Sequence, residues 1–254
     1  MRRIHHLFWD PARNLLWRGM NLTCELRSGL TVRVRSPADW AIYTEVLVNG
    51  EYDAAISRAI ERSSGEMQVL DLGANVGYFV FRCADMFLRS FDEKGLSIVA
   101  IEGSHRTAAD LHRRVESEIR LRHHVRVVHG LAGERSGSAY ISDSTASHYG
   151  NSLRRDAQDG AVKTSYVDLG TLVDPDRDID LLKCDIEGSE FSFIRNYKPL
   201  LSRVRTAVFE FHKYGEDLED YRALLRVCGL QRSSVLRETP LFSIEVFERG
   251  TEAL

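Results

Sequence analysis

The sequence predicts an α/β fold in which a mostly parallel, doubly wound sheet carries helices on both faces. From Met67 onward, short apolar runs alternate with segments of helical period, the pattern of right-handed βαβ crossovers. A glycine-rich turn follows the first of these runs and opens the first of these helices. The last two apolar runs are separated by a short polar turn, as in an antiparallel pair. In a chain of 254 residues, these observations favour one large α/β domain over two.

Five main strands and two closing strands make up the predicted sheet. The main strands are expected at residues 68–72, 96–101, 125–128, 179–184 and 204–211, and the antiparallel closing pair at 230–235 and 241–247. Helices are expected at residues 76–91, 106–121, 187–197 and 218–227. A Ser-, Gly- and Asp-rich insert runs from Gly133 to Gly160, and minor strands are expected at 139–141 and 162–167.

An N-terminal extension, residues 1–64, precedes the main domain at residues 65–254. Residues 22–26 and 30–34 alternate apolar and polar side chains around a Ser-Gly pair, which indicates a hairpin. A helix capped by Asp39 should follow, with apolar side chains that include Trp40, Tyr43, Val46 and Leu47. With a second helix at 52–62, the extension is expected to pack on the main domain.

Composition excludes several classes of protein. Hydrophobic residues make up 43% of the chain and charged residues 28%, as in ordinary globular domains. The net charge of −3 argues against nucleic acid as a partner, and no apolar run is long enough to span a membrane. The four cysteines form no C-x-x-C pair, which indicates reduced thiols and a cytoplasmic location. The oligomeric state stays open, and a homo-oligomer is one of the options.

The glycine-rich turn is the strongest indication of a ligand. It reads Asp71-Leu72-Gly73-Ala74-Asn75-Val76-Gly77 and lies between a strand and a helix, where nucleotide-binding turns are found. The spacing is not G-x-G-x-x-G, and an acid comes just before the first glycine. A pyrophosphate is disfavoured next to a carboxylate, whereas the ammonium group of S-adenosylmethionine is not. Glu102, which ends the second strand, can accept both ribose hydroxyls. Together these features favour S-adenosylmethionine over NAD.

Three blocks of the sequence resemble the FkbM-type methyltransferases. They cover residues 69–78, 99–103 and 182–190, and residues 45–52 look like the family's lead-in helix. The resemblance implies a Rossmann-like, seven-stranded class I methyltransferase sheet, S-adenosylmethionine as the donor, and O-methylation of a sugar or a glycosylated or polyketide natural product. On this basis the cofactor-binding residues are expected to be Asp71, Gly73, Ala74, Asn75, Gly77, Tyr78, Glu102, Gly103 and Asp185.

A hydroxyl acceptor needs help to lose its proton, and side chains at strand ends facing the cofactor are the candidates. Asp185, Glu187 and Glu190 follow the fourth strand, while Glu210 and His212 end the fifth. Alternation along each strand places Lys183 with Asp185, and Glu210 with His212. His212 and Asp185 are the favoured bases, with Glu210 as a third candidate. Glu190 is expected to cap and solvate the first turn of its helix rather than to act in catalysis.

A metal hypothesis and three competing functions accompany the leading interpretation. A divalent metal held by Asp185 and Glu210 ranks below a metal-free site, because neighbouring acids more often make ordinary polar contacts. A nicotinamide-dependent oxidoreductase, a silent binding protein and a methyltransferase acting on a macromolecule are the competing functions. The leading hypothesis is an O-methyltransferase whose partner is a small-molecule or carbohydrate acceptor.

Overall fold

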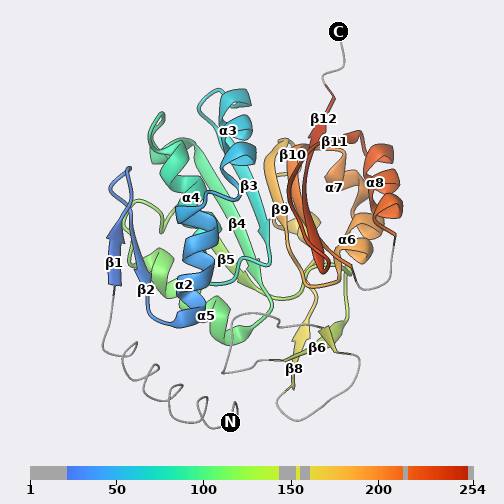
Figure 1. Ribbon diagram of the computed structural model, residues 1–254, viewed down its shortest axis with the longest axis horizontal. Helices are drawn as coiled ribbons and strands as arrows, with labels where there is room; N and C mark the ends of the chain where they lie inside the picture. Colours follow the sequence, from blue (N-terminus) through green and yellow to red (C-terminus); the bar gives the residue numbers. More distant parts are fainter. Residues whose placement is uncertain (1–21, 143–152, 155–160, 214–216, 251–254) are drawn as a thin grey trace.

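A seven-stranded sheet forms the centre of the molecule (Figure 1). The computed structural model describes residues 22–142, 153–154, 161–213 and 217–250. Its strands run in the order β11 (Leu230–Glu238), β12 (Phe242–Arg249), β10 (Val204–His212), β9 (Ile179–Cys184), β3 (Met67–Leu72), β4 (Leu96–Glu102) and β5 (Val125–His129). β12 is antiparallel to both of its neighbours, whereas the pairs from β10 to β5 are parallel. The predicted fold class and its antiparallel closing strands are confirmed.

The order of the strands reverses at β3. From β3 the chain moves outward through β4 to β5, and it then returns to the other side of β3 as β9 and continues to β10. β3 therefore pairs in parallel with both β4 and β9. Loops that leave β3 and β9 in opposite directions open a crevice at the carboxyl ends of the strands, where ligands of such sheets bind.

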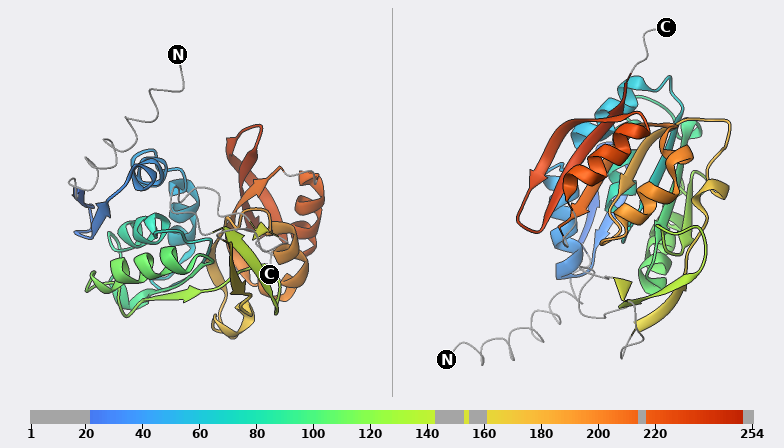
Figure 2. Two further views of the ribbon diagram at one scale, coloured as in Figure 1. Left: turned by 90° about the horizontal axis from the view of Figure 1, so that it is seen from below. Right: turned by 90° about the vertical axis from the view of Figure 1, so that its right-hand side faces the viewer.

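Helices cover both faces of the sheet. α3 (Asp53–Arg62), α4 (Tyr78–Phe87) and α5 (His105–Glu116) lie on one face, and α6 (Glu190–Asn196), α7 (Lys198–Leu201) and α8 (Leu218–Val227) on the other (Figure 1). Alternate residues of β3 serve the two cores, since Met67 and Val69 pack under α4 whereas Leu70 and Leu72 face α6. Short 3₁₀ turns occur at Glu93–Gly95 and Leu169–Thr171. Figure 2 shows the β11–β12 hairpin at the opposite edge of the molecule from α4 and α5.

Three predicted helices are shorter than expected, including the one expected at 106–121, which is α5 and ends at Glu116. The expected helix 76–91 is α4, which begins after Gly77, and the expected helix 187–197 is α6, which begins at Glu190. Glu187 and Gly188 adopt φ values of +52° and +98°, in the left-handed region. A helix cannot continue through such residues, so the chain makes a turn there before α6 starts.

The N-terminal extension is built as a hairpin and helices, as predicted. β1 (Leu22–Glu25) pairs antiparallel with β2 (Thr31–Val34), and α2 (Pro37–Tyr43) continues into a π-helical turn at Thr44–Val48. The capping residue differs from the expectation, because the Ser36 hydroxyl accepts the Asp39 N–H. Asp39 instead lies buried in the first turn and pairs with Arg114 of α5 at 2.8 Å. Trp40 is 45% exposed rather than part of the core.

The polar insert adds a small separate sheet. β7 (Leu153–Arg154), β6 (Ser138–Ser142) and β8 (Ala161–Ser165) are antiparallel, which confirms both minor strands (Figure 1). The rest of the insert, residues 143–152 and 155–160, and residues 1–21 of the extension lie outside the described residues. All four cysteines are described, and none forms a disulfide. Among the described helices, none has the length and apolar character needed to cross a membrane.

Candidate active site

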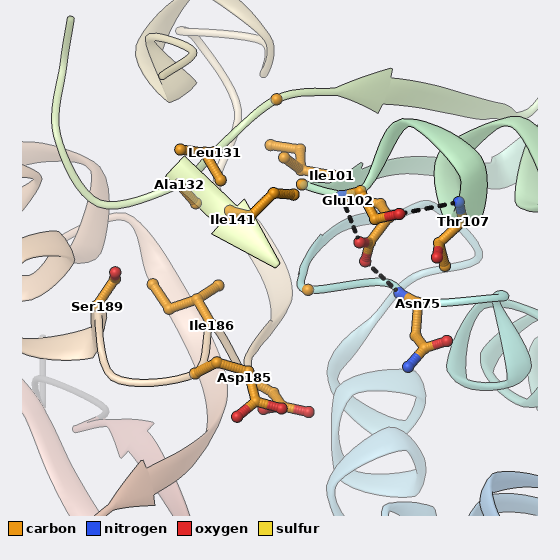
Figure 3. A pocket seen from close by; sticks show the side chains of 15 residues that line it. Asn75, Ile101, Glu102, Thr107, Leu131, Ala132, Ile141, Asp185, Ile186 and Ser189 are labelled. Atoms are coloured by element: carbon orange, nitrogen blue, oxygen red, sulfur yellow. Dashed lines mark hydrogen bonds between the residues drawn. The ribbon is translucent and has the colours of Figure 1, made fainter. Parts of the chain in front are cut away.

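Two adjoining cavities open at the carboxyl ends of β3, β4, β9 and β10. The first, here called the β4-side cavity, is lined by the turns after β3, β4 and β9 together with Ile141 of the small sheet (Figure 3). The second, the β10-side cleft, lies between the ends of β9 and β10, the N-terminal helices and the β11–β12 hairpin. Both cavities are lined by Gly73, Asn75, Asp185 and Glu187. The site therefore has two compartments that meet at the turn after β3.

Gly73 brings the turn after β3 into contact with the end of β9. Its φ is +75°, and a Cβ at this position would lie 1.7 Å from the Asp185 carbonyl oxygen. On the other side, the N–H groups of Gly73 and Ala74 donate to the Ile101 carbonyl at 3.0 and 2.9 Å. The turn is thus held between β4 and β9, and only glycine fits at its first position.

Gly77 has a different role from Gly73. Its φ is +92° at the start of α4, and a Cβ would meet Leu111 Cδ1 at 2.3 Å. It lines neither cavity, so this glycine permits the close packing of α4 against α5. Tyr78 is almost fully buried, and its hydroxyl donates to the Arg33 carbonyl of the hairpin at 2.9 Å. Tyr78 reaches only the β10-side cleft, so the structure does not place it or Gly77 in the β4-side cavity.

Glu102 closes the end of the β4-side cavity that lies next to α5. Its two carboxylate oxygens accept the N–H groups of Asn75 at 2.9 Å and Ser104 at 2.8 Å, as Figure 3 shows. Burial raises the pKa of Glu102 to about 7, although these two backbone bonds oppose the shift. Gly103, which is also expected to bind the cofactor, follows in the same wall, and a Cβ there would lie 2.9 Å from Leu131.

Asp71 and Lys183 form a buried pair behind the glycine turn. Lys183 Nζ lies 3.5 Å from Asp71 Oδ1 and 3.5 Å from Asp185 Oδ2, and it donates to the Gly73 carbonyl at 3.0 Å. Burial raises the pKa of Asp71 to about 6, with Lys183 pulling it down. Asp71 lines neither cavity, which differs from the expectation that it contacts the cofactor. Its side chain is fully buried and lies beside Lys183, its partner residue on the neighbouring strand β9.

The β10-side cleft has charged and aromatic walls. Its volume of about 470 Å³ is within the range of small-molecule sites. Acids from four segments face it, at positions Glu45, Glu51, Asp185, Glu187 and Glu210. Arg237 of β11 pairs with Glu45 at 3.3 Å and with Glu51 at 3.0 Å. Aromatic side chains complete the walls, namely Tyr52, Tyr78, Phe79 and Phe242.

His212 is surrounded by carboxylates. Its Nδ1 lies 3.1 Å from Glu190 Oε1, and its Nε2 lies 3.4 Å from Glu187 Oε2 and 3.8 Å from Glu210 Oε1. Burial lowers the pKa of His212, but the neighbouring carboxylates, Glu190 foremost, outweigh it and raise the pKa to about 9. Both ring nitrogens face carboxylates, so the imidazole is placed to carry or to meet positive charge rather than to accept a substrate proton. This geometry speaks against His212 as the base.

The other expected catalytic acids lie where the strand pattern placed them. Lys183 and Asp185 share one side of their strand end, and Glu210 and His212 share the cleft, as alternation predicts. Burial and the charge of Asp185 raise the pKa of Glu210 to about 8. Glu190 is fully buried rather than solvated, and its Oε1 accepts the N–H groups of Ile186 and Gly188. The expectation of a solvated Glu190 is wrong because the turn before α6 folds over it.

Comparison with known proteins identifies the family. Residues 71–231 match the family described as the methyltransferase FkbM domain, which covers more than half of the chain. The chain belongs to the FkbM methyltransferase family. It is an S-adenosylmethionine-dependent methyltransferase, which removes the nicotinamide-dependent alternative. No curated protein matches the sequence.

Solved structures of similar fold are distant in sequence. Fibrillarin from Aeropyrum pernix, with S-adenosylmethionine bound, is 13% identical over 78% of this chain and 74% of its own, with a TM-score of 0.45. Magnesium protoporphyrin IX methyltransferase from Synechocystis PCC 6803 is 14% identical over 97% and 96%, with a TM-score of 0.46. The 16S rRNA N2 G1207 methyltransferase of T. thermophilus is 12% identical over 91% and 50%, with a TM-score of 0.47.

Several lining residues were not foreseen from the sequence. In the β4-side cavity these are Ser104, Thr107, Leu131 and Ile141. Ser104 caps α5 by accepting the Thr107 N–H, so a capping serine two residues after Glu102 was an available signal. In the β10-side cleft, Glu51 and Arg237 are 186 residues apart and had no local signal.

Proposed function

We propose that this FkbM methyltransferase transfers a methyl group to a hydroxyl of a small polar molecule, such as a sugar or a glycosylated or polyketide natural product. The main support is that the two compartments meet at shared residues, with a carboxylate-rich floor on the acceptor side. Carboxylates accept hydrogen bonds from hydroxyls, and the rings of Tyr52 and Phe79 offer faces for the C–H surface of a sugar. The cleft volume of about 470 Å³ favours a small acceptor over a macromolecule.

The β4-side cavity suits S-adenosylmethionine. Its apolar walls, which include Ile101, Leu131 and Ile141, would cover the adenine, and the Glu102 carboxylate would accept ribose hydroxyls. Gly73 lets the turn lie against the Asp185 carbonyl, whereas any side chain there would push the turn away. When bound, S-adenosylmethionine supplies an already activated methyl group. The chain then has to orient the acceptor and remove its proton.

Glu210 is the best placed group to take that proton. Asp185 lines both compartments and is tied to Lys183, whereas Glu210 lines only the acceptor side. A base on the acceptor side can reach the hydroxyl without blocking the approach to the methyl group. Above its pKa of about 8 Glu210 is ionised, and its carboxylate would then accept the proton as the acceptor oxygen bonds to the methyl carbon and the carbon–sulfur bond of the donor breaks, which leaves S-adenosylhomocysteine.

A transfer assay with labelled donor tests the proposal. The panel of candidate acceptors should include sugars and glycosylated metabolites as well as amines and RNA. We expect label on hydroxyl acceptors, and Glu210→Gln should lower kcat by about 100-fold while affinity for S-adenosylhomocysteine stays unchanged. Glu219→Gln on α8, far from the cleft, is the matched control and should keep full activity. Transfer only to amines or RNA would contradict the proposed acceptor, and full turnover by Glu210→Gln would remove Glu210 as the base.

A further inference from the structure

Three metal-ligating side chains converge at the floor of the β10-side cleft. Asp185, Glu187 and His212 each offer one ligand atom, and these atoms lie within 4.8 Å of one another. In the part of the chain that the structure describes, this is the only group of three such residues. His212 Nε2 and Glu187 Oε2 are separated by 3.4 Å. Two neighbouring ligands of an octahedral cation with bonds of about 2.1 Å are about 3 Å apart, so this pair needs little movement to share a cation.

Glu190 holds the imidazole in the orientation that a metal ligand requires. Its Oε1 lies 3.1 Å from His212 Nδ1, so that Nε2 faces Glu187 and Glu210. Glu190 is itself fully buried and fixed by the N–H groups of Ile186 and Gly188. Metal-binding histidines commonly donate their second nitrogen to such a carboxylate, which fixes the tautomer and the ring orientation.

The carboxylates gathered around His212 give the floor of the cleft the negative charge of a cation site. Glu187 and Glu210 approach the same edge of His212, and Asp185 completes the group from the end of β9. Of the nearby cations, Lys183 shares its charge between Asp71 and Asp185, and Arg237 pairs with Glu45 and Glu51. A divalent cation would offset the mutual repulsion of the carboxylates.

We propose that Asp185, Glu187 and His212 bind one divalent cation of the Mg²⁺ or Mn²⁺ type, with Glu190 as a positioning residue. Two carboxylates and one imidazole suit these cations, and the open cleft leaves room for water or an acceptor oxygen as further ligands. This set differs from the Asp185 and Glu210 pair expected from the sequence, because the turn before α6 brings Glu187 to His212. If the proposed function holds, the cation would polarise the acceptor hydroxyl next to Glu210.

Binding of Mn²⁺ tests the site without any methyl transfer. The full chain, without donor or acceptor, is titrated with Mn²⁺ while free Mn²⁺ is followed by electron paramagnetic resonance. We expect one saturable site per chain. Glu187→Gln should weaken it at least about tenfold, and so should Glu190→Gln, which touches no metal. Glu45→Gln removes an equal charge from the same cleft and should leave the affinity unchanged.

Controls separate this inference from the proposed function. Each variant is also checked for S-adenosylhomocysteine binding, which shows that the fold and the β4-side cavity are intact. No saturable site in a chain that binds S-adenosylhomocysteine would overturn the metal site and leave the proposed function standing. Equal losses of Mn²⁺ affinity in Glu45→Gln and Glu187→Gln would also overturn the metal site, because they would indicate attraction by the overall charge of the cleft. A single saturable Mn²⁺ site that depends on Glu187 would support the metal site even if no hydroxyl acceptor were methylated.

Discussion

The two compartments of the site are built in different ways. The β4-side cavity is made largely of backbone, with the glycine turn after β3 held between Ile101 and Asp185 and the turn after β4 capped by Ser104. The β10-side cleft is made of long side chains from the N-terminal helices, β9, β10 and the β11–β12 hairpin. The first suits a ligand that is the same throughout a family. If the proposed function holds, the second can change its acceptor by changing side chains, because side chains form most of its walls.

Lys183 lines the β10-side cleft and donates to the carbonyl of Gly73 in the turn that both compartments share, and its loss should have the largest effect. Lys183→Met leaves Asp71 buried without its cation, and we expect a loss of about 3–5 kcal/mol in the free energy of unfolding. Urea denaturation measures it, with the exposed Lys163→Met as the control. Adding Asp71→Asn to Lys183→Met should recover part of the loss. A loss below about 1 kcal/mol would mean that the pair does not hold the two compartments together.

The backbone character of the β4-side cavity can be tested at Gly73. Gly73→Ala places a methyl group against the Asp185 carbonyl, so affinity for S-adenosylhomocysteine should fall by about 100-fold, near 2.7 kcal/mol. Isothermal titration calorimetry measures it. Gly29 has a similar φ of +87° but open space around it, so Gly29→Ala should cost only about 1 kcal/mol of stability and leave affinity unchanged. Equal affinity in both variants would contradict the tight turn.

Glu102 is the exception on the β4 side, since there a side chain rather than backbone is expected to meet the cofactor. Its pKa of about 7 means that the ionised form, which accepts ribose hydroxyls, becomes dominant only as the pH rises through that value. Affinity for S-adenosylhomocysteine should therefore rise between about pH 6 and pH 8 and then level off. The charges of Lys183 and Asp71 also act on Glu102, in opposite directions.

Glu102→Gln sharpens this prediction. The substitution should weaken binding at neutral pH by about tenfold and flatten the pH profile, because the amide does not titrate in this range. The same calorimetric titrations at several pH values measure both effects. A variant that keeps the wild-type pH profile would show that another group controls the affinity.

The sequence predicted the parts of the site that depend on consecutive residues better than the parts that depend on residues far apart in the chain. The turn from Gly73 to Asn75 and the acid Glu102 are predictable because each depends on a few consecutive residues at the end of a strand. Alternation also placed Glu210 and His212 together in the cleft. It could not show that Asp71 faces Lys183 inside the sheet, since that contact depends on the pairing of β3 with β9.

The sequence by itself determined the α/β fold, the antiparallel closing strands and the family, because these follow from hydrophobic period and short motifs. Only the tertiary structure decided what each charged side chain does. Glu190 became a buried support for His212, and Glu187 became its neighbour, because the turn before α6 is left-handed and folds both acids toward β10. The charge environment of a side chain is set by neighbours that are distant in sequence, and the local sequence pattern does not identify those neighbours.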